Sequence, residues 1–147
     1  MGGLVSGIAF GRDPGSVFLH GGQLNAHTWD GTILRTGAAA IAYDLPGHGH
    51  SLRLAADGYT TKAIAELVTT RILADTEHDI VLVGHSYGAM VGAVVAATLG
   101  RRVNALIILD ATPHRIGTAE DDPETILVGT LDQLVGSVHA RVPQRRR

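Results

Sequence analysis

The pentapeptide Gly84-His85-Ser86-Tyr87-Gly88 constrains the fold of this chain more than any other segment. It lies between the apolar run 79–84 (DIVLVG), which predicts a buried strand, and the alanine- and glycine-rich stretch up to residue 99, which predicts a helix packed close to a sheet. A serine in such a turn has a strained backbone, and the residues two positions before and after it approach each other, so those positions favour glycine. The motif therefore predicts a sharp bend that presents the Ser86 hydroxyl above a sheet, at the positive end of the following helix.

Short apolar runs alternate with helical patterns along the rest of the chain, which is typical of βα units that build a parallel sheet. We predict strands at residues 4–10, 16–20, 38–44, 79–84 and 103–110, and helices at 28–35, 60–75, 86–99 and 122–141. In the second helix, Ile64, Leu67, Val68 and Ile72 follow a 3.6-residue period, with Arg71 as the polar exception. The predicted fold class is α/β, with a mostly parallel sheet of about five strands flanked by helices.

Composition excludes several classes of function. The chain has no cysteine, which rules out disulfides, thiol catalysis and cysteine-based zinc sites, and its formal net charge of −2 gives no reason to expect a nucleic-acid partner. No apolar run approaches the roughly 20 residues of a membrane span, and the first residues lack the basic flank of a secretory signal. We therefore expect a cytoplasmic protein that does not associate with membranes.

No metal or cofactor is expected. His48 and His50 are spaced like a metal pair, but the following Leu52 and Arg53 do not supply the further ligands that a metal hydrolase needs. The same loop lacks the third glycine of a dinucleotide-binding fingerprint, and the chain has no phosphate-binding GxxxxGK[ST] segment.

A second motif, His20-Gly21-Gly22-Gln23, ends the second predicted strand. Acyl transfer places negative charge on a carbonyl oxygen, which two preorganised backbone N–H groups can stabilise. We expect one donor from Tyr87 and the other from Gly22, with Gln23 as the alternative. Taken alone, these residues would indicate an ordinary tight turn; together with the serine bend they predict an oxyanion hole.

The order of these motifs resembles the α/β-hydrolase fold superfamily. The HGG segment is followed by Trp29, then by DLPGHGHS at 44–51, GHSYG at 84–88 and ILDATP at 108–113. Within the superfamily, the chain is most similar to esterase-like and perhydrolase-like single-domain hydrolases. The resemblance implies a small-molecule acyl substrate, such as an ester or thioester, and attack by Ser86. It also implies that 44–51 is a structural loop beside the active site, and the serine argues against dehalogenase and epoxide hydrolase activity, which use aspartate.

A nucleophilic serine needs a base to take its proton and a carboxylate to orient that base. In the family these follow the serine in the order acid, then histidine. By this resemblance Asp110 is the candidate acid, with a purely structural aspartate as the alternative. The base stays unidentified, because His139 lies in an expected helical stripe, His114 is only four residues from Asp110, and His85 is adjacent to the serine.

The family normally continues with a cap segment and two more strands that carry the acid and the histidine. We accordingly expect residues 4–115 to form the N-terminal part of a hydrolase core, 116–141 the helical start of a cap, and 142–147 a disordered basic tail. On this expectation the chain is a truncated hydrolase of weak or no activity, whose last strand exposes an apolar edge that favours self-association. The alternative function is a non-catalytic hydrolase-like protein that binds a small molecule or a partner.

Overall fold

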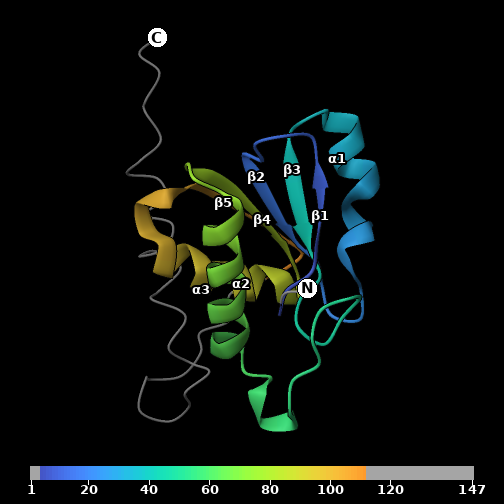
Figure 1. Cartoon of the computed structure of the whole chain (residues 1–147), viewed down its shortest axis with the longest axis vertical. Coiled ribbons are helices and arrows are strands. Elements are labelled where there is room, and N and C mark those ends of the chain that lie inside the picture. The colour runs from blue at the N-terminus through green and yellow to red at the C-terminus, as the bar shows by residue number, and fades with distance from the viewer. Residues whose placement is uncertain (1–3, 112–147) are drawn as a thin grey trace.

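The structure is a computed structural model that describes residues 4–111, which form a five-stranded sheet flanked by helices (Figure 1). The strands are β1 (Gly7–Phe10), β2 (Ser16–Leu19), β3 (Ala40–Tyr43), β4 (Ile80–His85) and β5 (Val103–Leu109). Their order in the sheet is β1-β3-β2-β4-β5. Only β1 runs antiparallel to its neighbour, so the prediction of a mostly parallel sheet is confirmed.

The helices are α1 (Asp30–Thr36), α2 (Thr61–Asp75) and α3 (Tyr87–Leu99), with short 3-10 turns η1 (Ala26–Trp29), η2 (Ala56–Gly58) and η3 (Gly100–Arg102). The first helical segment begins earlier than predicted, because the Asn25 side chain accepts the His27 N–H and caps η1. In this part of the chain no helix is long and apolar enough to cross a membrane. The predicted helix at 122–141, the cap segment and the basic tail lie outside the described residues.

The first strand is shorter than predicted because the residues before it pair with a loop rather than with β3. The Leu4 carbonyl accepts the Leu52 N–H at 3.2 Å, and the Ser6 N–H donates to the Ser51 hydroxyl at 2.8 Å. These bonds fasten the loop after β3 to the start of the chain, so residues 4–6 help to position that loop.

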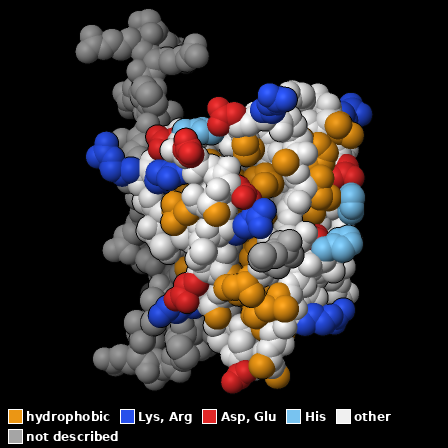
Figure 2. Space-filling model, viewed as in Figure 1, with side chains coloured by type: hydrophobic (Ala, Val, Ile, Leu, Met, Phe, Trp, Pro, Cys, Tyr) orange, Lys and Arg blue, Asp and Glu red, His pale blue; other side chains and the backbone are white. Residues whose placement is uncertain are grey.

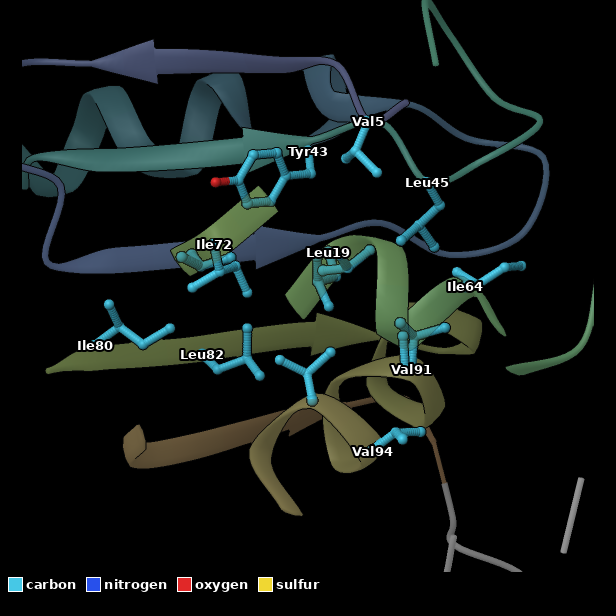
Figure 3. Packing of buried hydrophobic residues seen from close by; sticks show 14 of the residues in the cluster. Val5, Leu19, Tyr43, Leu45, Ile64, Ile72, Ile80, Leu82, Val91 and Val94 are labelled. Atoms are coloured by element: carbon cyan, nitrogen blue, oxygen red, sulfur yellow. The ribbon is translucent and has the colours of Figure 1, made fainter. Parts of the chain in front are cut away.

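Apolar side chains are buried on both faces of the sheet. Along β2, Val17 and Leu19 belong to a cluster that also contains side chains of α2 and α3, and Figure 3 shows Leu19 within it. Phe18 belongs to a second cluster and packs with Trp29. This alternation follows from the two-residue period of a strand. Burial on both faces explains why the central strands are continuous apolar runs.

Arg71, the polar exception in the apolar face of α2, is explained by its link to the buried Tyr43. The Arg71 Nε donates to Asp75 Oδ2 at 2.7 Å, and the Tyr43 hydroxyl donates to the same oxygen at 2.8 Å. Burial raises the pKa of Tyr43, and the hydrogen bond to Asp75 raises it further. Arg71 therefore neutralises a carboxylate that binds β3 to α2.

One edge of the described sheet carries exposed apolar side chains. Within residues 4–111, β5 has β4 as its single neighbour, and the side chains of Ile107 and Leu109 are 44% and 41% exposed. Elsewhere on the surface, acidic and basic side chains are interspersed, as Figure 2 shows for one face. Within the described residues β5 is thus an edge strand, and self-association through it stays a prediction.

Candidate active site

Ser86 occupies a strained bend between β4 and α3. Its φ of 49° and ψ of −117° are sparsely populated by residues other than glycine. The Ser86 N–H donates to the Leu109 carbonyl at 2.9 Å, and its carbonyl accepts the Ala89 N–H at 2.9 Å as α3 begins. Backbone strain of this kind persists only where surrounding contacts hold it in place, and it is concentrated at functional sites.

The two glycines of the motif make room for different neighbours. A Cβ at Gly84 would lie 2.5 Å from the Ala89 Cα, so this glycine lets the bend close on itself. A Cβ at Gly88 would collide with the backbone oxygens of Leu19 and His20. The second glycine therefore lets α3 approach the end of β2, whereas the motif alone predicted that both glycines relieve contact across the bend.

The end of β2 brings residues 20–24, which we call the oxyanion loop, against the serine. Strands β2 and β4 are adjacent and parallel, with Leu19 opposite Gly84, so their carboxyl ends lie side by side. A Cβ at Gly21 would lie 3.3 Å from the Ser86 Cβ, whereas a Cβ at Gly22 would meet nothing within 4 Å. Two motifs that are distant in sequence thus meet beside an open space.

Hydrogen bonding distinguishes the two candidate donors in this loop. The Gln23 N–H donates to His48 Nε2 at 3.3 Å, whereas the Gly22 N–H has no acceptor among residues 4–111. This difference favours Gly22 as the donor to a substrate oxygen. Tyr87 is the first residue of α3, where backbone N–H groups point out of the helix and carry its partial positive charge.

The buried side chain of His20 hydrogen-bonds to the oxyanion loop, a role that the motifs in the sequence did not predict. The Leu45 N–H donates to His20 Nε2 at 2.9 Å, so the proton must reside on Nδ1, which donates to the Gly21 carbonyl at 2.7 Å. Burial lowers the pKa of His20, which keeps the ring neutral. The signal in the sequence was a histidine at the end of a buried strand, directly before two glycines.

The loop at 44–51 is tied to the segment after β2 through Asp44. The Asp44 carboxylate accepts the Ala26 N–H at 2.7 Å and the His50 N–H at 2.8 Å. A Cβ at Gly49 would overlap the same carboxylate, so the loop can close only with glycine there. These contacts agree with a structural role for this loop.

Asp110 lies at the same end of the sheet as Ser86. It follows β5 directly with a φ of 49°, and its side chain is 91% exposed. Its Oδ2 lies 3.8 Å from Nε2 of His85, the residue before the serine. An exposed pair at this distance contributes little to stability.

Each of the six histidines among residues 4–111 has a partner other than the Ser86 hydroxyl. The pairs are His20 with Gly21 and Leu45, His27 with Asp30, His48 with Gln23 and Pro46, His50 with Asp44, His78 with Asp13, and His85 with Asp110. His114 and His139 lie outside the described residues. No group of three metal-binding side chains is found in the part that the structure describes.

The chain is similar in sequence to known hydrolases. A family model for the alpha/beta hydrolase fold matches residues 17–142. An esterase from Mycobacterium tuberculosis is 36% identical over 115 residues, which cover 78% of this chain and 39% of that protein. A pimeloyl-[acyl-carrier protein] methyl ester esterase from Vibrio campbellii is 34% identical, covering 71% of this chain and 40% of its own length.

Solved structures give the same picture. A crystal structure of the M. tuberculosis esterase superposes with a TM-score of 0.71 over 77% of this chain and 39% of that one, at 36% identity. An epoxide hydrolase from Bacillus megaterium superposes with a TM-score of 0.65 at 25% identity, over 71% of this chain and 38% of that one. The chain thus spans about two fifths of the length of these relatives.

Proposed function

Because the chain belongs to the α/β-hydrolase fold family, we propose that it is a serine hydrolase, or the Ser86-bearing part of one, that acts on ester-like acyl bonds. The observation that carries this proposal is the strained Ser86 held against the oxyanion loop, with open space beside Gly22. The names of the esterases from M. tuberculosis and V. campbellii favour carboxylic esters over other acyl bonds. A cytoplasmic location stays a prediction from composition.

In the proposed reaction, the Ser86 hydroxyl attacks the carbonyl carbon of the ester and gives its proton to a base. The carbonyl oxygen becomes an oxyanion, which the N–H groups of Gly22 and Tyr87 stabilise. Collapse of this intermediate expels the alcohol, which takes the proton back from the base and leaves an acyl group on Ser86. Water then repeats the same steps, releases the acid and restores the serine.

We further propose that the base comes from outside residues 4–111. The six histidines in that part are engaged with other groups, and His85, the nearest to the serine in sequence, is directed to Asp110 and Gly21. Asp110 is our candidate for the carboxylate, because it lies at the same end of the sheet as Ser86. If neither His114 nor His139 serves as this base, the 147-residue chain alone is expected to turn over esters slowly or not at all.

Labelling with a fluorophosphonate probe tests the proposal, because the probe forms a tetrahedral adduct on an activated serine. Catalytic sites that lack one member of the triad keep a residual acceleration of about 10³–10⁴ over water. We therefore expect the folded chain to label faster than the same chain in urea, and Ser86→Ala to abolish this labelling. If a base is missing, added imidazole increases the labelling rate in proportion to its concentration.

Two results would contradict parts of this proposal. Labelling of the folded chain no faster than that of the unfolded chain, even with imidazole, would favour the non-catalytic binding protein. Fast labelling that ignores imidazole would place the base within the chain, and single substitutions of His114 and His139 would then locate it.

A further inference from the structure

A second histidine, His48, contacts the oxyanion loop from the loop at 44–51. Its Nε2 accepts the Gln23 N–H at 3.3 Å, and its Nδ1 lies 3.2 Å from the Pro46 carbonyl oxygen. The ring packs edge-on against His20, with centroids 5.0 Å apart. An imidazole that accepts at Nε2 and donates from Nδ1 is neutral, so this arrangement requires the unprotonated form of His48.

The backbone that His48 holds is strained. Gln23 has a φ of 63°, a conformation that costs a residue other than glycine of the order of 1–3 kcal/mol and persists only where contacts hold it. The Leu24 N–H closes the turn by donating to the Gly21 carbonyl at 3.3 Å. The N–H of Gln23 belongs to the peptide group that joins it to Gly22, so the acceptor on His48 fixes the plane of that peptide.

We propose that His48 is a positioning residue for the oxyanion hole: by accepting the Gln23 N–H, it holds the oxyanion loop so that the Gly22 N–H is directed at the substrate oxygen. This inference rests on the proposed function of Gly22. His48 contacts no reacting atom in this role and acts only through the backbone of the loop. The loop at 44–51 was predicted to be purely structural, and its positioning role rests on the hydrogen bond between His48 and Gln23, which are 25 residues apart in sequence.

The contact requires the neutral form of His48, which accepts at Nε2. Among the described residues, the titratable groups near this junction of the two loops include His20, Asp44, His50 and His85, whose ring lies against Gly21. His20 has both ring nitrogens bonded, and the Asp44 carboxylate accepts two backbone N–H groups, with the His50 Nδ1 3.7 Å away. Protonation of His48 would turn Nε2 into a donor that faces the Gln23 N–H, which removes the bond and frees the loop.

The first test is an NMR titration of the full chain with 15N labelling. We expect the Gln23 amide resonance to shift with pH, with the same midpoint as the ring resonances of His48, and this shift to vanish in His48→Gln. His50→Ala is the matched control, because its side chain is 86% exposed and its bond to Asp44 is made by the backbone N–H. A Gln23 amide that ignores pH in the wild type, or still titrates in His48→Gln, would overturn the contact.

The second test measures Ser86 labelling by the fluorophosphonate. We expect His48→Ala to lower the maximal labelling rate about ten- to a hundredfold, with little change in the probe concentration that half-saturates the rate. His48→Gln, which keeps an acceptor, should recover most of that rate, and His50→Ala should match the wild type. Labelling of His48→Ala at the wild-type rate would overturn the positioning role.

The two tests separate failure of this inference from failure of the proposed function. If the wild type itself does not label, the proposed function fails, and the NMR titration alone decides whether His48 holds the loop. If His48→Ala does not fold, the labelling rate of the wild type as a function of pH replaces it: the rate must fall as His48 protonates, and His48→Gln must lack this component.

Discussion

The bend at Ser86 depends on the absence of side chains at Gly84 and Gly88. Gly84 accommodates the Cα of Ala89, and Gly88 accommodates the backbone oxygens at the end of β2. In both cases the obstructing atoms belong to the main chain, so they cannot move aside as the end of a flexible side chain would. The strain of the serine is therefore balanced by close packing of backbone against backbone.

Substitution at Gly88 tests this account. We expect Gly88→Ala to lower the free energy of unfolding by about 1–3 kcal/mol, because its Cβ would force α3 away from β2. Urea unfolding provides the measurement. The control is Gly31→Ala in α1, where a Cβ meets nothing within 4 Å and alanine is expected to stabilise by up to about 1 kcal/mol. Equal stability of the two variants would show that Gly88 is not sterically required.

His20 makes the stability of the protein dependent on pH. Because burial lowers its pKa below the ordinary 6.5, the unfolded chain takes up this proton first as pH falls. The contribution of neutral His20 is thus complete above pH 6.5 and is lost progressively below it. Urea unfolding at pH 7.5 and 5.5 should show this loss. The His20→Gln variant should be less stable than the wild type at pH 7.5, but its free energy of unfolding should fall less between pH 7.5 and 5.5. An unchanged pH slope in His20→Gln would contradict this prediction.

At the level of elements, the periodic spacing of apolar residues predicted the sheet and the helices well. The five strands and the three long helices of the described part all occur where the pattern placed them, with ends that differ by a few residues. The strand predicted from Leu4 begins only at Gly7, and η1 starts before the predicted helix. These differences arise from single side chains and loop contacts, which a periodic pattern does not contain.

Part of the candidate site could likewise be predicted from the sequence, and part could not. The motifs around Ser86 and Gly22 were evident because a strained bend and a close backbone approach restrict which residues are tolerated. The contributions of His20 and His48 were missed, because each bonds to a loop 25 residues away in sequence. Contacts of this kind follow from the order of the strands, which the sequence did not specify.

The bond between Tyr43 and Asp75 connects β3 with α2, and its removal should be measurable. Because the acceptor is a charged carboxylate, we expect Tyr43→Phe to lower the free energy of unfolding by about 1.5–3 kcal/mol. Tyr59→Phe is the control, since its hydroxyl accepts the Leu54 N–H at an exposed site and should contribute less. Chemical denaturation compares the two, and a larger loss in Tyr59→Phe would argue against this role of the pair.

For the whole molecule, the exposed face and edge of β5 predict association between copies. Within residues 4–111, the outer edge of β5 pairs with no strand, and this edge and the exposed Ile107 offer a surface to a second chain, so the mass in light scattering should rise with concentration. Ile107→Lys should weaken this association, because a lysine on an edge strand must be desolvated when another strand pairs with it. Leu34→Lys, on α1 and 70% exposed, should leave it unchanged. A monomer at every concentration would refute the prediction.

The pairing of β2 with β4 also has a consequence for folding during synthesis. Strand β2 has β3 and β4 as neighbours, but along the chain β4 is separated from it by α1, β3 and α2. While the polypeptide is being synthesised, β2 can pair with β3 long before β4 leaves the ribosome, and one side of β2 stays open in the interval. Such distant pairings are slow and leave nascent chains prone to aggregation. We therefore expect production of the protein to depend on chaperones that shield this strand until residue 85 has emerged.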